Sequence, residues 1–205
     1  MRRYQPLLET ERLRLRPFVA EDAETVQSLA GAREIADTSL SIPHPYSLDA
    51  VKAWISGQVF SFQQNTSLHF AIELRESGEL IGAIELAQIE PGPAQAELRF
   101  WVGKRWWGQG YASEAAREIL RYGFESLQLN RVYAHFLSRS PRSGQMLRRL
   151  RMKKEGVLRQ RARKWDAFED VTLYAIVRDD LTATRKPARR KRERSEPPRR
   201  PRPRA

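Results

Sequence analysis

The sequence contains no cysteine, and this absence removes several chemistries at once. A chain without thiols forms no disulfide, offers no thiolate to a metal and has no cysteine nucleophile. The sequence also lacks any apolar run of the length that a membrane-spanning helix needs. Its charged start, MRRYQPLLETERLRL, lacks the continuous apolar core of a secretory signal. These absences favour a cytoplasmic protein.

Acidic residues are scarce only at the end of the chain. The formal net charge is +12, but residues 183–205 alone hold 11 Lys or Arg and 2 Glu. That segment has five prolines and no large apolar residue, so it cannot bury enough surface to offset the entropy of ordering. We predict one domain over residues 1–182 and a disordered basic tail over residues 183–205. The tail either contacts RNA, ribosomes or acidic membranes through counterion release, or is a solvated solubility segment.

The rest of the chain alternates strand and helix patterns. Apolar and polar residues at period two, or short apolar runs between turn residues, predict strands over residues 12–18, 68–75, 78–90, 94–103 and 131–138. A hairpin turning near Asp166–Phe168 closes the domain over residues 155–179. Helical spacing predicts helices over residues 20–31, 48–63, 112–127 and 142–150. This order predicts a mixed α/β (α+β) domain with an antiparallel first half.

Three of these elements assign side chains to faces. In the helix over residues 48–63, we expect an inward face made of Val51, Trp54, Ile55 and Val59. In the helix over residues 112–127, we expect the inward residues Ala115, Ala116, Ile119, Leu120 and Phe124. Strand alternation over residues 94–103 places Leu98, Phe100 and Val102 on one face, and Glu97, Arg99 and Trp101 on the other.

The stretch RWWGQGYA, residues 105–112, joins that strand to the helix that follows it. Unpaired amides at a helix start, together with the helix dipole, attract anions. Gly108 and Gly110 allow positive φ and a close approach of the backbone to a phosphate. The stretch is neither a P-loop nor a G-x-G-x-x-G fingerprint. Taken alone, it is either an anion-binding loop or an ordinary tight turn.

The surroundings of the glycines resemble a known family. Arg105, Gly108 and Gly110 match the pattern R/Q-x-x-G-x-G/A, which resembles the acetyl-CoA pyrophosphate loop of the GNAT superfamily of N-acyltransferases. The longer run AELRFWVGKRWWGQGYASEAA resembles the RimJ/RimL branch, which acetylates protein N-termini. The resemblance covers roughly residues 7–179. It implies the GNAT acyl-CoA N-acyltransferase fold, a central mixed and largely antiparallel sheet flanked by helices, with acetyl-CoA as the acyl donor.

The resemblance also implies which residues hold acetyl-CoA. The amides from Trp106 to Ala112 would bind the pyrophosphate, and the strand at Phe100–Val102 would pair with the pantetheine arm and stabilise the thioester oxyanion. We interpret the rings of Trp106 and Trp107 as apolar anchors rather than stacking partners. The expected cofactor-binding residues are Phe100, Trp101, Val102, Arg105, Trp106, Trp107, Gly108, Gln109, Gly110, Tyr111, Ala112 and Ser140.

Acyl transfer to an amine requires a proton acceptor, donors for the oxyanion and stabilisation of the leaving thiolate. Glu97 occupies the strand-glutamate position of the family and is the candidate general base, acting through water. The alternative is a structural glutamate paired with Arg99. Ser143 matches the serine of the branch's N-x-x-S pattern and would contact the cofactor sulfur, or it caps the helix that follows. Ser140 replaces the asparagine of that pattern, which weakens one expected cofactor contact.

Other polar residues point to the acceptor side. Asp37, His44 and Tyr46 lie in or beside the proline-rich loop over residues 37–47, which borders the acceptor cleft by resemblance; each is a candidate substrate contact or a structural loop residue. The three histidines lack metal-ligand spacing, so we expect no metal site. The basic run RSPRSGQMLRRLRMKK either steers phosphates and acidic partners or forms a solvated face.

Together, these observations predict an acetyl-CoA-dependent N-acetyltransferase acting on the N-terminal α-amine of a protein, of the ribosomal-protein type. A small amine such as a polyamine, an amino acid or an aminoglycoside is the main alternative acceptor. A CoA- or nucleic-acid-binding module without turnover is the second alternative, because one scaffold serves many functions. A homodimer is a further possibility that the resemblance allows.

Overall fold

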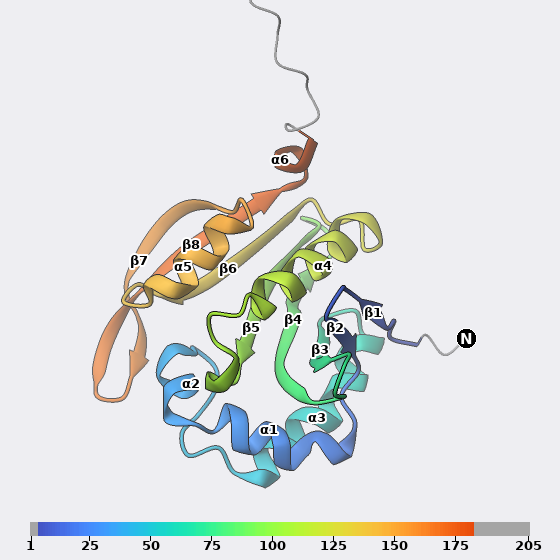
Figure 1. Ribbon diagram of the computed structural model, residues 1–205. Coiled ribbons are helices and arrows are strands. Elements are labelled where there is room, and N and C mark those ends of the chain that lie inside the picture. The colour runs from blue at the N-terminus through green and yellow to red at the C-terminus, as the bar shows by residue number, and fades with distance from the viewer. Residues whose placement is uncertain (1–3, 183–205) are drawn as a thin grey trace, which may run out of the picture.

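The computed structural model describes residues 4–182, and the predicted basic tail lies outside the described residues. One eight-stranded sheet runs through the molecule in the order β1-β2-β3-β4-β5-β6-β8-β7 (Figure 1). Its strands are β1 (Leu8–Glu9), β2 (Leu13–Arg16), β3 (Leu68–Leu74), β4 (Leu80–Glu90), β5 (Gln95–Val102), β6 (Arg131–Leu137), β7 (Lys153–Lys164) and β8 (Ala167–Val177). All neighbours are antiparallel except β5 and β6, which are parallel. The sequence predicted this mixed, largely antiparallel sheet.

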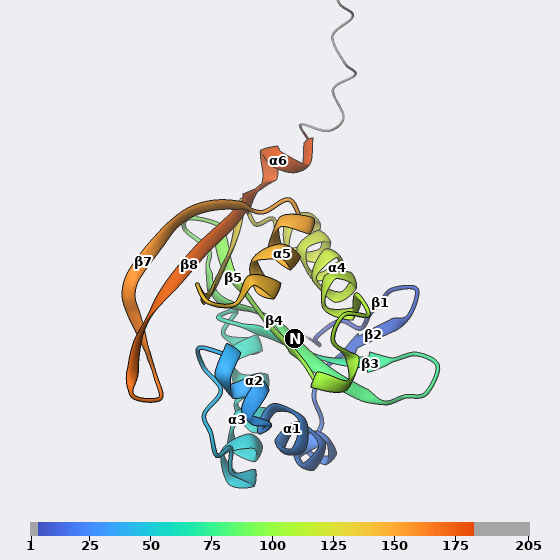
Figure 2. The same ribbon diagram turned by 60° about the vertical axis from the view of Figure 1, so that its left-hand side comes forward.

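Helices cover both faces of the sheet (Figures 1 and 2). They are α1 (Ala23–Ala30), α2 (Arg33–Thr38), α3 (Leu48–Gln63), α4 (Tyr111–Glu125), α5 (Pro141–Arg149) and the short α6 (Arg178–Thr182). Helices α4 and α5 pack on one face and enclose the larger apolar cluster, whereas α1 and α3 enclose a smaller one on the other face. All five inward residues predicted for α4 are buried.

Strand β5 separates these two layers as its alternation predicts. Leu98 and Val102 are buried in the larger cluster and Phe100 packs against it. On the opposite face, Trp101 packs against the smaller cluster, and Glu97 is also buried. Glu97 therefore faces away from α4 and α5, toward the layer that contains α1 and α3.

Helix α3 differs from the prediction at one inward position. Val59 is 63% exposed, whereas Gln58 is 6% exposed. Residue 58 lies seven positions after Val51, close to two full turns, so it stacks above that buried valine; residue 59 is rotated by most of a right angle. The helical period, not side-chain polarity, decides which residue faces inward. The predictions for Val51 and Ile55 are confirmed.

Helix α2, strand β1 and the five-residue helix α6 were not expected. Helix α2 occupies part of the segment where the sequence indicated only a loop from residue 37, and it begins without a side-chain hydrogen bond at its N-cap. The two-residue strand β1 pairs with β2. All three are too short to produce a periodic pattern of their own.

Candidate functional site

Strands β5 and β6 pair at one end and diverge at the other, so their backbones form a V (Figure 1). The two strands pair only at Gln95–Arg131, Ala96–Val132 and Glu97–Tyr133. Beyond these pairs β5 continues to Val102 and β6 continues to Leu137. Each strand then leads into a helix, α4 or α5, so two helix starts flank the open end. Glu97 lies at the point of the V.

The divergence leaves one edge of β5 open. Gly103 donates its N–H to the carbonyl of Ile81, which fixes the hydrogen-bonding alternation with β4. By that alternation, the backbone groups of Leu98, Phe100 and Val102 point away from β4, toward the V. The Trp107 indole already donates to the Val102 carbonyl at 2.6 Å. Phe100 thus presents backbone donor and acceptor groups to an extended ligand.

The glycine loop, residues 107–110, adopts the backbone conformation that its sequence predicts. Gly108 has φ of 81° and Gly110 has φ of 86°, both in the left-handed region that favours glycine. Gly110 is the N-cap of α4 and provides no capping side chain. The first amides of α4 are therefore available to an anion.

Two of the predicted amide donors are already used. The amides of Trp106 and Trp107 donate to Gly103 and Lys104 within the 3-10 turn Lys104–Trp106. Because of this turn, the amide donors that remain in the predicted set run from Gly108 to Ala112. The Trp106 ring is buried in the larger core cluster and the Trp107 ring packs against it, which agrees with our interpretation of both rings as anchors.

Charged side chains contact the glycine loop and the start of α4. Arg12, from β1–β2, donates to the Gln109 carbonyl at 3.2 Å and lies over the Tyr111 ring at 4.4 Å. It also pairs with Glu114 in the first turn of α4 at 2.6 Å. Arg105, by contrast, has a largely exposed side chain, which approaches Glu79 at 3.5 Å and lies over the Trp106 ring at 5.5 Å. Arg12 is therefore a cation beside the glycine loop that sequence patterns did not indicate.

The start of α5 lies next to the same loop, because Arg142 stacks over the Trp107 ring at 5.4 Å. Ser140 is the N-cap residue of α5 but makes no capping hydrogen bond. Ser143 lies in the first turn of the helix, so the predicted alternative of a helix-capping role for it is wrong. The two serine hydroxyls lie 3.0 Å apart. They form a small polar pair on the β6 side of the V.

Glu97 is 5% exposed and has two partners. Arg99 donates from Nε to Glu97 Oε2 at 2.8 Å, as the structural alternative predicted. His135 Nδ1 lies 3.0 Å from Oε1. Burial disfavours the charge on Arg99, but hydrogen bonding and attraction from Glu97 outweigh it, and the Arg99 pKa is raised. His135 was missed, because its proximity depends on the β5–β6 pairing.

Charges continue from Glu97 across the sheet. Arg99 Nη1 lies 3.6 Å from Glu85 on β4, and Glu85 pairs with His69 on β3. The result is a row of ionisable side chains on four neighbouring strands, from His135 on β6 to His69 on β3. Tyr46 borders this row: burial, together with the charge of Glu85, raises the pKa of the Tyr46 phenol. Of the three predicted substrate contacts, Tyr46 is the one close to this row.

Asp37, on α2, and His44, in the proline-rich loop, lie instead beside the tip of the β7–β8 hairpin. Asp37 accepts two hydrogen bonds from Arg139, at 3.0 and 2.9 Å, and one from the Trp165 indole at 2.8 Å. His44 contacts the Gly31 carbonyl through Nδ1 at 3.0 Å, and its ring meets Trp165 edge-on. These interactions attach the hairpin tip to α2 and to the proline-rich loop. Both predicted contacts thus have structural partners in this arrangement.

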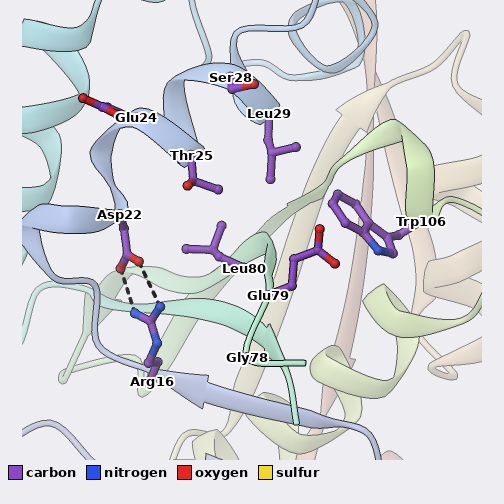
Figure 3. A pocket seen from close by; sticks show the side chains of 10 residues that line it. All are labelled: Arg16, Asp22, Glu24, Thr25, Ser28, Leu29, Gly78, Glu79, Leu80 and Trp106. Atoms are coloured by element: carbon purple, nitrogen blue, oxygen red, sulfur yellow. Dashed lines mark hydrogen bonds and ion pairs between the residues drawn. The ribbon is translucent and has the colours of Figure 1, made fainter. Parts of the chain in front are cut away.

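A separate cavity of about 550 Å³ lies between α1, the β3–β4 turn and Trp106 (Figure 3). Arg16 and Asp22 face each other in it as an ion pair at 2.7 Å. It contains neither Glu97 nor the glycine loop, so we do not assign it to the site. Over residues 4–182, no group of three or more His, Asp or Glu is arranged to hold a metal. No helix in that range has the length and hydrophobicity to cross a membrane.

The arrangement fits an elongated ligand with anionic and amide-bearing parts. Free amides at the glycine loop and the nearby Arg12 match phosphates, and the open edge of β5 matches a peptide-like chain. At the apex, buried charge is available for proton transfer to or from a reacting group. Coenzyme A has this composition, so the residues present fit acetyl-CoA.

Comparisons with known proteins agree with this geometry. The family described as "Acetyltransferase (GNAT) domain" matches residues 12–153. The N-acetyltransferase YoaA of Bacillus subtilis (strain 168) is 29% identical over 173 residues, covering 84% of this chain and 97% of YoaA. The ribosomal-protein-serine acetyltransferase of Escherichia coli (strain K12) is 32% identical over 125 residues, covering 61% of this chain and 69% of that protein. A RimL ribosomal-protein acetyltransferase solved with coenzyme A superposes with a TM-score of 0.77 at 17% identity, covering 84% of this chain and 98% of that one.

Proposed function

Since the chain belongs to the GNAT family of acetyltransferases and is an N-acetyltransferase that uses acetyl-CoA, we propose that its acceptor is the N-terminal α-amine of a protein. The observation that carries this proposal is the similarity to a ribosomal-protein-serine acetyltransferase at 32% identity. The resemblance of the central motif to the RimJ/RimL branch points to the same acceptor class. A small amine remains the alternative acceptor.

The net reaction converts an ammonium and a thioester into an amide, a free thiol and one proton. Bound acetyl-CoA supplies an activated acetyl group, so the protein needs no nucleophile of its own. The chain must hold the two substrates in line, remove a proton from the ammonium and provide donors where negative charge develops.

We assign these tasks to residues around the V. The amides from Gly108 to Ala112, with Arg12 beside them, hold the pyrophosphate. The backbone of Phe100, on the open edge of β5, aligns the pantetheine arm and donates toward the developing oxyanion. Ser143, hydrogen-bonded to Ser140, lies at the start of α5 and stabilises the departing sulfur. Glu97 provides negative charge at the apex, where the acceptor amine must lose its proton.

The acceptor is tested by incubating the full chain with radiolabelled acetyl-CoA and a bacterial lysate, which is then separated into macromolecules and small molecules. We expect label on protein, and mapping of labelled peptides should place it at N-terminal residues. Label confined to the small-molecule fraction would contradict the proposed acceptor and favour a metabolite or drug. Label no higher than in the enzyme-free control would favour a binding module without turnover.

Three further predictions accompany this proposed function. They are a cytoplasmic location, a homodimer, and contact of the tail over residues 183–205 with RNA or the ribosome. The tail has a charge excess suited to nucleic acid. Sedimentation of the full chain, with and without ribosomes, measures both the assembly state and the contact.

A further inference from the structure

Both carboxylate oxygens of Glu97 already have a hydrogen-bond partner, which limits what the residue can do alone. One oxygen accepts from Arg99 Nε at 2.8 Å and the other lies 3.0 Å from His135 Nδ1. A carboxyl oxygen that takes up a proton stops accepting from an N–H donor at that position. Glu97 can therefore act as the base only through an acceptor position beside these contacts, in a site where 5% of the residue is exposed.

His135 has one ring nitrogen left for chemistry. A carboxylate oxygen only accepts, so Nδ1 must carry the hydrogen that fills its contact with Glu97. In the neutral ring, Nε2 then holds a lone pair and can accept a proton. Within residues 4–182, Nε2 makes no hydrogen bond, and a quarter of the His135 side chain is exposed.

The position of His135 suits contact with the acceptor. The last paired residues of β5 and β6 are Glu97 and Tyr133, so His135 lies two residues beyond the pairing, on the same face as Glu97. Its strand neighbours Ala134 and Phe136 point to the opposite face, into the larger core cluster. The imidazole therefore borders the V rather than the core.

We propose that His135 is the catalytic base of this acetyltransferase, with Glu97 as the residue that positions its ring and Arg99 as the residue that holds Glu97. Nε2 takes one proton from the acceptor ammonium: an N–H bond breaks at the amine and forms on the ring. The amine attacks the thioester carbonyl with the freed electron pair, the C–N bond forms as the C–S bond breaks, and the second amine proton passes to the CoA thiolate. The imidazolium faces the Glu97 carboxylate. Water removes the proton from Nε2 afterwards. This inference rests on the proposed function and names the base of the same site.

Side chains from three strands surround His135. Glu97 and Arg99 face it from β5, Tyr133 lies beside it on β6 with ring centroids 5.4 Å apart, and its partner on β8 is the apolar Leu173. Burial and the charge of Glu97 raise the pKa of Tyr133, and the Arg99 pKa is also raised. Neither group changes charge between pH 5 and 8, where imidazoles titrate.

The first test reads the tautomer without requiring activity. Long-range ¹H–¹⁵N spectra of the full chain resolve the imidazole nitrogens of three histidines, and His135→Gln assigns one set. We expect His135 to carry its hydrogen on Nδ1, with a lone pair on Nε2. Glu97→Gln should shift the ring toward the Nε2–H form, because the amide can offer a donor to Nδ1. An Nε2–H ring in the unmodified chain would overturn the proposal.

The second test is kinetic. The chain has no cysteine, so a thiol reagent reports only the CoA released when acetyl groups pass to probe amines, here short peptides with N-terminal serine or alanine, and spermidine. We expect His135→Gln to lower kcat/KM about 100-fold or more, with unchanged acetyl-CoA binding, and to leave a pH profile set by deprotonation of the free amine alone. Arg121→Gln is the control: it removes a charged side chain paired with Glu118 and Glu125 on the exposed side of α4, and should change kcat/KM less than threefold.

The outcomes separate this proposal from the proposed acceptor. Turnover of spermidine but not of the peptides would contradict the proposal that the acceptor is a protein. The role of His135 could then still be tested with spermidine as the acceptor. A His135→Gln variant that retains more than a third of kcat/KM and the original pH profile would overturn the role of His135, whichever amine is used. If no probe is turned over, the first test still decides the role of His135, because an Nε2–H ring would overturn it.

Discussion

At the residue scale, two glycines decide whether the anion loop can form. Gly108 and Gly110 have φ of 81° and 86°, but the space around each is open: a Cβ on Gly108 would meet nothing within 4 Å, and one on Gly110 only the Arg12 guanidinium at 3.6 Å. Backbone conformation, not crowding, therefore requires glycine at both positions. The sequence carried this information in the spacing of the two residues.

Gly110→Ala tests that requirement. An L-residue in the left-handed region costs roughly 1–2 kcal/mol, so we expect a lower Tm and weaker acetyl-CoA binding, measured by thermal unfolding and calorimetric titration. Gly57→Ala is the control, because Gly57 lies inside α3 with open space around it; it should stabilise the fold by roughly 0.4–1 kcal/mol and leave binding unchanged. Equal effects of the two substitutions would show that the loop conformation does not matter.

The same scale shows where sequence reasoning stops. The alternation of β5 placed Glu97 opposite Leu98 and Val102, and the burial of all three confirms it. His135 lies 38 residues from Glu97, and only the short parallel pairing of β5 with β6 brings the two together. Local periodicity assigns a residue to a face but contains no information about which strand will be its neighbour.

At the scale of elements, side chains link the tip of the β7–β8 hairpin to α2 and the proline-rich loop, in addition to the pairing of β8 with β6. Trp165 donates to Asp37 of α2, Arg33 stacks over the Trp165 ring at 5.1 Å, and Lys164 reaches the Ile42 carbonyl at 3.3 Å. Arg139, which follows β6, ties Asp37 to Glu169 on β8. This cluster fixes one side of the proline-rich loop over residues 37–47.

We expect low pH to break the contacts of Asp37 with Arg139 and Trp165. Hydrogen bonds from Arg139, then from Trp165, lower the Asp37 pKa. Stabilisation from a lowered carboxyl pKa is present above the unfolded value, about 3.9, and is lost as pH falls through the folded value. We expect the Trp165 indole N–H resonance to move with a midpoint below about 3.9. Asp37→Asn should abolish that transition, and a midpoint above 3.9 would contradict the proposed attachment.

Elements with long periodic patterns were predictable, and short ones were not. Helices α3 and α4 and the β3–β4 and β7–β8 hairpins follow from spacing and turn residues, as at Gly78, whose φ is 71°. Helix α2 has six residues and no capping side chain, and it is held by contacts such as that of Asp37 with Arg139. Such tertiary support leaves no local pattern to recognise.

At the scale of the whole molecule, charge is unevenly distributed. Residues 183–205 account for +9 of the net charge of +12, so the rest of the chain is nearly balanced. The site and both core clusters lie within residues 4–182. We therefore expect the tail to contribute to RNA binding without contributing to folding or to acetyl transfer.

Deleting residues 183–205 tests this expectation. We expect the Tm and the rate of CoA release to stay unchanged, and affinity for RNA to fall. Because up to 11 basic side chains are lost, the salt dependence of RNA binding should also become shallower. Filter binding at low and moderate salt measures both quantities. Unchanged affinity and salt dependence would leave the tail as a solubility segment only.

The central claim is that acetyl-CoA binds in the V between β5 and β6, and amide hydrogen exchange with and without acetyl-CoA tests it most directly. We predict slower exchange along residues 98–102, in the glycine loop with the first turn of α4, and at residues 138–143. Exchange at α1 and the β3–β4 turn, which line the separate cavity, should not change. Protection at that cavity, with none at the V, would contradict the account.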